Sequence, residues 1–275
     1  MRAGARFNGL LAAMVAASGC LRPPDPLELH PDVVSVAIML EGGKREARLL
    51  AAHPHRDPNE PAPTVTVTLR GPGWTAAFSD TLELVECIPP NSGQGPARCL
   101  RAVLPEEVRA GATYEIEGTA PLGAFSGEVT MPAVPVLIEP GDSLHVPNPT
   151  DYEDHLIPVR YRIGSDVGTL LADAFDVFLT REDGTEWEVE GHYVGDFPVA
   201  LEGAEADTFR IHYHERPLRF SLRLLGIGRH YTNFLENEGT FPLPQPWPSF
   251  GIEGEGVYGY FDGAVPSRVS RVWVQ

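Results

Sequence analysis

The stretch PTVTVTLR, residues 63–70, alternates strictly between apolar and polar side chains. Successive side chains of a β-strand point to opposite faces of the sheet, so Val65, Val67 and Leu69 would share one face and the threonines the other. The pattern predicts a strand with one face buried in a core and the other exposed to water.

Similar short segments lie on both sides of this strand, separated by many of the 27 prolines and 28 glycines of the chain. Runs at 33–40 and 45–51, joined by a Gly-Gly pair, predict a β-hairpin. Short strands broken by turn residues are typical of β-sandwiches and barrels. We therefore expect an all-β protein, with an immunoglobulin-like β-sandwich over residues 33–139 and a second β-rich domain over residues 150–275.

Two segments of the second domain look helical. The first is a short run at 169–174, and the second covers 228–237. In the second, Tyr231, Phe234 and Leu235 follow the i, i+3, i+4 spacing of an amphipathic helix. We expect one or two short helices beside the strands.

The N-terminus has the order of a secretory signal. Arg2 and Arg6 precede an almost uncharged apolar stretch at 7–17, and small residues follow. This order of positive, apolar and small residues is typical of a cleaved signal peptide. The apolar stretch is shorter than the roughly 20 residues that a transmembrane helix needs. Residues 1–19 are therefore predicted to be removed.

The small residues Ser18 and Gly19 before Cys20 resemble a lipobox, the motif at which bacterial lipoprotein signals are cut and the cysteine is acylated. The alternative is an ordinary secretory signal with an incidental cysteine. Two acyl chains hold a protein at a membrane without a protein helix. The sequence predicts a lipidated Cys20, a proline-rich tether over residues 20–32 and, because Leu21 follows the cysteine, sorting to the outer membrane.

The charge balance is strongly acidic. The formal net charge of −17 would fall to −19 on loss of residues 1–19, which contain two arginines and no acid. Such a chain repels nucleic-acid phosphates and anionic headgroups. We expect no nucleic-acid partner, whereas cationic ligands or calcium remain possible.

Acylation of Cys20 would leave two cysteines, Cys87 and Cys99, in an oxidising compartment. An even number in such a compartment favours a disulfide. The alternative, a thiolate metal site, would need closer cysteine spacing. We expect a disulfide that closes a short loop rich in proline and glycine.

Two further phrases occur in the same order as in a known group. Residues 111–114, Gly-Ala-Thr-Tyr, lead into a predicted strand, and the glycine-rich phrase from Ile252 to Phe261 lies near the end. Together with the lipobox, they make the chain resemble an uncharacterised family of bacterial surface lipoproteins. Genes of that family commonly lie beside those of TonB-dependent outer-membrane receptors. The resemblance implies an accessory role in uptake, with no catalytic residues.

The same phrase contains Gly254-x-Gly256-x-x-Gly259, which matches a dinucleotide-binding pattern. That site needs a strand before the glycines, a helix after them and an acid about 20 residues later. Only 16 residues follow Gly259, and they look extended. We expect glycines that serve a tight turn, and no cofactor.

His212 and His214 lie on one face of a predicted strand and are the best metal candidates, although zinc needs three or four ligands. An exposed strand face is the simpler interpretation. The nucleophile motif Gly-x-Ser-x-Gly is absent, while paired carboxylates for glycoside hydrolysis stay open.

Aromatic residues near the C-terminus form a candidate binding surface or, alternatively, part of the second core; they are Trp247, Phe250, Tyr258 and Tyr260. Rigid aromatic surfaces suit contacts with partners or carbohydrate. The favoured function is a non-enzymatic surface lipoprotein that binds an outer-membrane receptor or nutrient ligand. The alternatives are a surface hydrolase or metal-binding protein that uses the two histidines, and a purely structural envelope protein.

Overall fold

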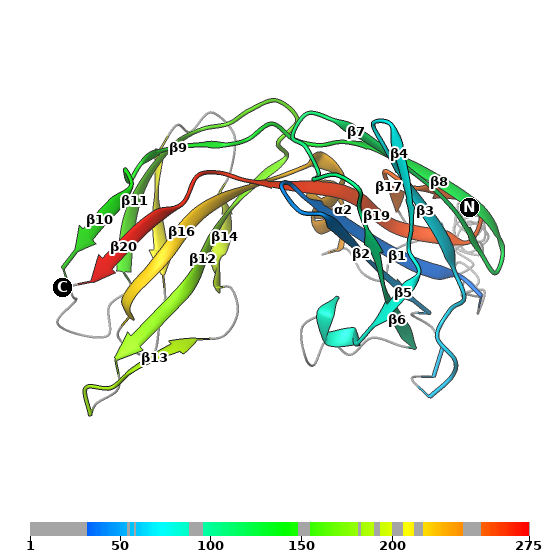
Figure 1. Cartoon of the computed structure of the whole chain (residues 1–275), viewed down its shortest axis with the longest axis horizontal. Helices are drawn as coiled ribbons and strands as arrows, with labels where there is room; N and C mark the ends of the chain where they lie inside the picture. The colour runs from blue at the N-terminus through cyan, green and yellow to red at the C-terminus, as the bar shows by residue number, and fades with distance from the viewer. Residues whose placement is uncertain are drawn as a thin grey trace, which may run out of the picture.

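A computed structural model of the chain describes residues 32–53, 56–57, 59–87, 96–147, 155–180, 183–189, 193–199, 206–211, 217–238 and 249–274. Strands dominate these residues, together with one 3-10 turn, η1 (Leu84–Glu86), and one α-helix, α2 (Arg229–Glu238) (Figure 1). The predicted all-β class is confirmed. The strands form two lobes, each with facing sheets around its own hydrophobic core.

Lobe 1 packs a five-stranded sheet, ordered β18-β8-β7-β3-β4, against the strands β19-β1-β2-β6-β5 of a larger sheet that continues into lobe 2. Its strands are β1 (Val34–Glu41), β2 (Glu46–Ala52), β3 (Thr66–Gly71), β4 (Trp74–Ala77), β5 (Asp80–Leu82), β6 (Ala97–Val103), β7 (Thr113–Ala120), β8 (Gly123–Thr130), β17 (Ser249–Phe250), β18 (Glu253–Gly254) and β19 (Val257–Pro266). The side chains of Val65, Val67 and Leu69 are buried between the sheets, as the alternation at 63–70 predicts.

Lobe 2 packs a three-stranded sheet, β15-β11-β9, against β12, β16 and their neighbours. Its strands are β9 (Val136–Glu139), β10 (Ser143–Val146), β11 (His155–Arg162), β12 (Thr169–Thr180), β13 (Glu186–Val189), β14 (Tyr193–Val199), β15 (Ala206–Ile211), β16 (Pro217–Ile227) and β20 (Ser270–Val274). Burying the apolar faces of both sheets stabilises the lobe, at about 25 cal/mol per Å² of apolar surface removed from water.

The predicted helix at 169–174 is wrong, because this segment is the start of β12. Leu170, Ala172 and Ala174 all point into the core of lobe 2 and have no exposed surface. Their spacing of two fits a strand buried on one side. The high apolar content of the segment hides this alternation in the sequence.

One sheet of twelve strands runs through both lobes (Figure 1). β19 pairs in parallel with β1 along its length, and its end pairs with β16 of lobe 2 at Leu225, Gly226 and Ile227. Because most of β19 lies beside β1, Phe261 and Val265 belong to the lobe 1 core. The C-terminal segment 249–266, which the sequence groups with the second domain, packs in the first.

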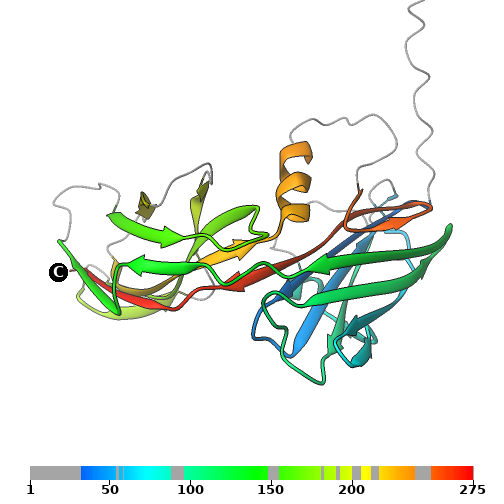
Figure 2. The same ribbon diagram turned by 90° about the horizontal axis from the view of Figure 1, so that it is seen from above.

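The predicted helix at 228–237 is confirmed as α2. It stands off one side of the strands near the middle of the molecule (Figure 2). We call this side of the twelve-stranded sheet, which faces away from both cores, the outer face. Thr232 of α2 donates to Thr169 Oγ1 on β12 at 2.9 Å, and Asp262 on β19 accepts from the helix backbone. α2 thus spans the junction between the lobes.

Candidate binding face

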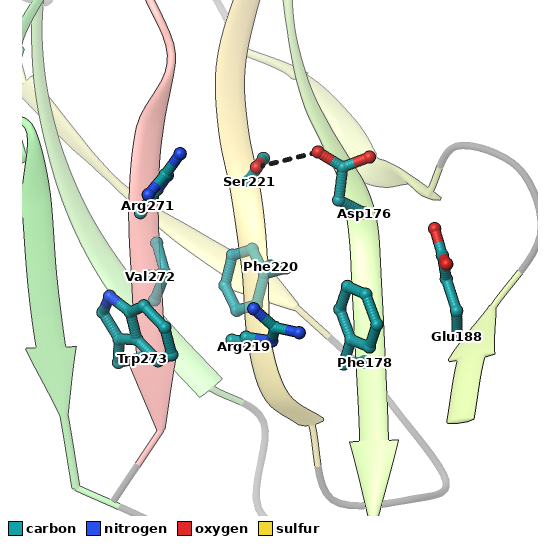
Figure 3. Close-up of a pocket in the computed structure, with 9 residues that line it drawn as sticks. All are labelled: Asp176, Phe178, Glu188, Arg219, Phe220, Ser221, Arg271, Val272 and Trp273. Carbon is teal, nitrogen blue, oxygen red and sulfur yellow. Dashed lines mark hydrogen bonds between the residues drawn. The ribbon is translucent and has the colours of Figure 1, made fainter. Parts of the chain in front are cut away.

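A row of five side chains crosses the outer face of lobe 2. His145, Trp273, Arg219, Phe178 and Glu188 lie on adjacent strands and are successive register partners. We call them the cross-strand row, and four of its members are drawn in Figure 3. With neighbouring strands about 4.8 Å apart, the row extends for roughly 19 Å.

The centre of the row is an arginine between aromatic rings. The Cζ atom of Arg219 lies 3.9 Å from the centroid of the Phe178 ring and 5.8 Å from that of Trp273. Trp273 in turn stacks on His145, with centroids 6.5 Å apart and planes at 14°. A guanidinium that stacks on rings keeps its in-plane N–H donors available. The rings therefore hold Arg219 in one orientation without using its hydrogen-bonding capacity.

A β-bulge in β12 gathers further side chains on the same face. The register between β12 and β16 shifts between Phe175 and Phe178, so that Asp176 and Val177 share one partner position. Asp176 has a φ of 49°, which is uncommon for a residue other than glycine. Val177 is buried in the core, whereas Asp176 is exposed and accepts a hydrogen bond from Ser221 Oγ at 3.2 Å. Bulges commonly redirect side chains next to functional sites.

These side chains surround a hollow of about 270 Å³ on β12, β13, β16 and β20 (Figure 3). The lining includes two arginines, Arg219 and Arg271, and two acids, Asp176 and Glu188. Within the part of the chain that the structure describes, neither arginine forms an ion pair with a carboxylate. The hollow therefore offers both unneutralised guanidinium groups and exposed carboxylates.

The next arginine on β16 is bound differently. Arg223 donates to the buried carboxylate of Asp173 at 2.6 Å, lies 3.7 Å from Glu41 of lobe 1, and packs on the Phe175 ring at 5.0 Å. This contact ties the two lobes together on the outer face. Its charge is already compensated, so it is structural and not a ligand-binding group.

A second aromatic cluster lies beneath α2. Tyr260 contacts the rings of Tyr231 and Phe234 at 4.9 and 5.1 Å, and Phe250 meets Phe234 edge-on at 6.5 Å. Tyr258 is only 9% exposed, and its burial raises the pKa of the phenol to about 12. Three of the four aromatic residues predicted as a binding surface are thus packed within the protein. The fourth, Trp247, lies outside the described residues.

The glycine-rich phrase forms a turn and a strand. Gly256 has a φ of 69° in the turn between β18 and β19, as the tight-turn interpretation predicts. Gly259 lies within β19, where a Cβ would lie 2.1 Å from the carbonyl oxygen of Val36. A strand, not a helix, follows these glycines, so the context of a dinucleotide site is missing.

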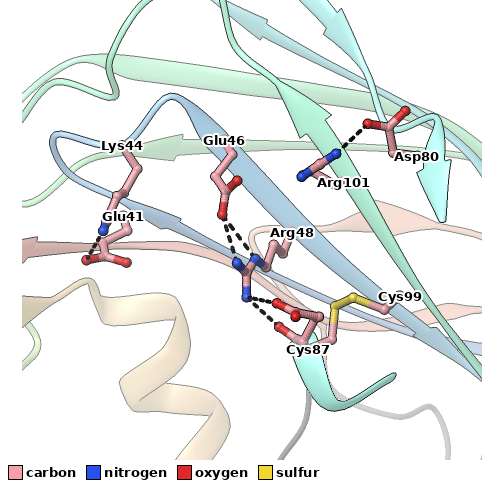
Figure 4. A network of polar contacts seen from close by, with 9 residues as sticks. Glu41, Lys44, Glu46, Arg48, Asp80, Cys87, Cys99 and Arg101 are labelled. Carbon is pink, nitrogen blue, oxygen red and sulfur yellow. Dashed lines mark hydrogen bonds and ion pairs between the residues drawn. A yellow bond between two sulfur atoms is a disulfide. The ribbon is translucent and has the colours of Figure 1, made fainter. Parts of the chain in front are cut away.

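The predicted disulfide between Cys87 and Cys99 is present, with Cα atoms 5.7 Å apart (Figure 4). It fastens η1 to β6. Beside it, Arg48 donates to the backbone oxygen of Glu86 at 2.8 Å and to Glu46 Oε1 at 2.9 Å. These contacts hold η1 over β2 at the lobe 1 end of the outer face.

The remaining sequence-predicted sites, Cys20, His212 and His214, lie outside the described residues. Where the structure describes the chain, no three His, Cys, Asp or Glu side chains are grouped closely enough to hold a metal ion. In that same part, no helix has the length and apolar character needed to cross a membrane.

No protein-family model and no curated protein matches this chain. Distant matches to solved structures exist. The N-terminal Ig1-2 module of the Drosophila receptor protein tyrosine phosphatase DLAR is 14% identical, with a TM-score of 0.31, over 90% of this chain and all of that one. The titin domains Z1Z2, solved in complex with telethonin, are 14% identical, with a TM-score of 0.21, over 89% of this chain and 94% of that one. The D0-D1 domain of intimin is 8% identical, with a TM-score of 0.21, over 87% and 97%. These likenesses concern the fold alone.

Proposed function

We propose that this chain is a lipid-anchored, non-enzymatic binding protein of the bacterial outer membrane, accessory to a TonB-dependent receptor, with the outer face of lobe 2 as its binding surface. The observation that carries the proposal is the cross-strand row. An arginine held between aromatic rings and left without a carboxylate partner among the described residues is suited to binding, because its donors are oriented and unused.

The direction of β1 supports this use of lobe 2. β1 starts beside Val257, at the end of lobe 1 away from lobe 2, and ends at Glu41, which contacts Arg223 of lobe 2. A tether from Cys20 to Asp32 reaches at most about 45 Å when fully extended. An anchor at Cys20 would therefore attach at the end of lobe 1 away from the cross-strand row and keep that end within about 45 Å of the membrane.

Residue types on the face support recognition of a partner. Trp and Arg are enriched at protein interfaces, and here Trp273 and Arg219 lie side by side. The excess of acidic residues elsewhere keeps the protein off anionic headgroups. The outer face would then remain open to a receptor or its ligand.

Affinity capture of the intact, acylated protein from its own membranes in mild detergent tests the proposal. The wild type should recover an outer-membrane receptor, and Trp273→Ala should recover at least about tenfold less, because an aromatic anchor contributes about 1.4 kcal/mol or more. Arg160→Ala is the matched control, since Arg160 is exposed on β11 in the opposite sheet of lobe 2.

Recovery of no receptor by the wild type would contradict the proposal. Equal recovery by Trp273→Ala, with folding verified by circular dichroism, would show that the outer face of lobe 2 is not the binding surface. Loss of recovery with Arg160→Ala as well would indicate a general effect of substitution in lobe 2 and would also count against the assigned face.

A further inference from the structure

The cross-strand row and its neighbours combine three kinds of chemical group in one hollow. Arg219 and Arg271 supply guanidinium donors, Asp176 and Glu188 supply carboxylate acceptors, and Trp273 supplies an aromatic surface. A ligand that satisfies all three must carry an anionic group, several hydrogen-bond donors and an apolar face. This combination narrows the class of ligand.

The two arginines define the anionic part. Arg219 pairs with Trp273, and Arg271 pairs with Ser221, so the two arginines are diagonal neighbours on antiparallel strands. Diagonal neighbours lie roughly 7–8 Å apart. In Figure 3 the guanidinium of Arg219 extends toward Phe178 and that of Arg271 extends away from Arg219, so each arginine would hold a different anionic group of the ligand. Arginine binds carboxylates through two parallel N–H bonds. Anionic groups of the ligand would neutralise charges that the described residues leave uncompensated.

The two acids define the donors. Asp176 is exposed at the bulge and already accepts from Ser221 Oγ, which leaves its second carboxylate oxygen available. Glu188 lies on β13, the strand next to Phe178. An ionised carboxylate accepts hydrogen bonds and cannot donate them. The ligand must therefore present hydroxyl or amine donors within a few ångströms of its own anionic group.

We infer that the hollow on the outer face of lobe 2 binds a glycan that contains uronic acid. Along a chain of uronic acids, each pyranose ring carries one carboxylate, several hydroxyl donors and an apolar C–H face, so that neighbouring rings together would meet the two arginines, the two acids and Trp273. The inference rests on the proposed function, because it names the ligand class for that same surface.

Competing anions fit less well. A phosphodiester group would meet the two arginines, but it has no hydrogen-bond donor to offset its repulsion from Asp176 and Glu188. A sugar ring supplies hydroxyls at the positions where the acids lie.

Calorimetric titration of the intact protein in detergent micelles tests this inference. The probe is a hexamer of α-1,4-linked galacturonic acid, and the comparison is the same hexamer with its carboxylates converted to methyl esters. The esters keep the rings and hydroxyls but remove the charge. We expect the acid to bind and the ester to bind at least about tenfold more weakly, because a charged hydrogen bond contributes about 1.4 kcal/mol or more.

Variants assign the contact. Arg219→Gln and Arg271→Gln should each weaken binding of the acid hexamer at least about tenfold. Arg271 is exposed and makes no described ring contact, so its replacement should leave folding intact even if the Arg219 variant is destabilised. Arg160→Gln, on the opposite sheet, should bind as the wild type does.

Equal affinity for the acid and the ester, or unchanged affinity in both arginine variants, would overturn the inference. Failure of the acid hexamer to bind would also overturn it, and capture of a receptor that depends on Trp273 would show that the proposed function stands without it. Failure of both experiments would remove the inference and the proposed function together.

Discussion

Asp262 Oδ2 on β19 accepts a hydrogen bond from the backbone N–H of Tyr231, the third residue of α2, at 2.6 Å. Its other carboxylate oxygen accepts from the N–H of Gly263 at 2.7 Å. The carboxylate therefore lies at the positive end of the helix dipole and caps α2 from another strand. The residue is 1% exposed, and burial raises the pKa of its carboxyl group, while the N–H of Tyr231 acts in the opposite direction.

This raised pKa predicts a pH dependence of stability. The folded chain holds the Asp262 proton more tightly than the unfolded chain, whose carboxyl has the ordinary pKa near 3.8. The stability from that proton is fully present below the unfolded pKa and is lost as the pH rises through the interval up to the raised folded pKa. Asp262→Asn removes the titration, so the free energy of unfolding of the variant should rise relative to that of the wild type as the pH increases.

Urea unfolding from about pH 4 to pH 7 measures this difference. Asp176→Asn provides the control, since that carboxylate is exposed. If Asp262→Asn and the wild type show parallel curves of unfolding free energy against pH, the assignment of the buried acid is wrong.

Arg268 is predicted to stabilise the corner between β9 and β10. Its guanidinium donates to the backbone oxygens of Leu137, Ile138, Pro140 and Gly141 at 2.7 to 3.2 Å. Because hydrogen bonds to charged groups contribute about 1.5–3 kcal/mol, Arg268→Ala should lower the free energy of unfolding by about 2–4 kcal/mol. Arg160→Ala, which breaks only an exposed ion pair with Glu139, should cost less than about 1 kcal/mol. Similar losses in both variants would show that Arg268 acts as an ordinary surface residue.

The disulfide is predicted to stabilise lobe 1. Cys87 and Cys99 are 12 residues apart. Closing a loop of about this size restricts the unfolded chain and thereby increases the free energy of unfolding by about 3 kcal/mol. Reduction of the wild type and the double substitution Cys87→Ala, Cys99→Ala should both lower the melting temperature. Equal melting temperatures for the reduced and the oxidised protein would indicate that the disulfide does not constrain the unfolded chain.

Contact between Arg219 and the Phe178 ring predicts energetic coupling. In a double-mutant cycle with Arg219→Gln and Phe178→Leu, unfolding free energies should depart from additivity by about 0.5–1 kcal/mol, the range for a cation–π pair near the surface. The matched cycle with Arg271→Gln and Phe178→Leu should be additive, because no described contact joins Arg271 to that ring. Additivity in both cycles would exclude a stacked arginine at the centre of the row.

Local periodicity explains which elements the sequence reveals. Val65, Val67 and Leu69 alternate within one strand, and Tyr231 and Phe234 repeat within one helix, so both patterns are visible over a few residues. The strand that begins at 169–174 is not visible in the sequence, because nearly all of its residues are apolar. Only the structure shows that alternate side chains point into the core of lobe 2.

The candidate face depends on contacts between distant segments. Phe178, Arg219 and Trp273 lie on three strands that are far apart in sequence and become neighbours only through the register of β12, β16 and β20. The bulge that exposes Asp176 has no local signature in the sequence. One signal was available: along β16, Arg219, Ser221 and Arg223 alternate with buried apolar residues, which indicates a basic outer face.

The parallel pairing of β1 with β19 also joins segments that are far apart in the sequence. It joins residues 34–41 to residues 257–264 and places the glycine-rich phrase against the first strand. Gly259 is required there because a side chain would collide with the Val36 carbonyl. The sequence shows the glycines but not the strand that approaches them.

We propose that this protein works from a membrane, held by acyl chains on Cys20. Mass spectrometry of the N-terminal peptide from protein purified out of its own cells tests it most directly. We expect a mature chain that begins at Cys20 and carries the added mass of a diacylglyceryl group. An N-terminal peptide that retains residues 1–19, or one that begins at Cys20 with a free thiol, would contradict the anchor and the function proposed from it.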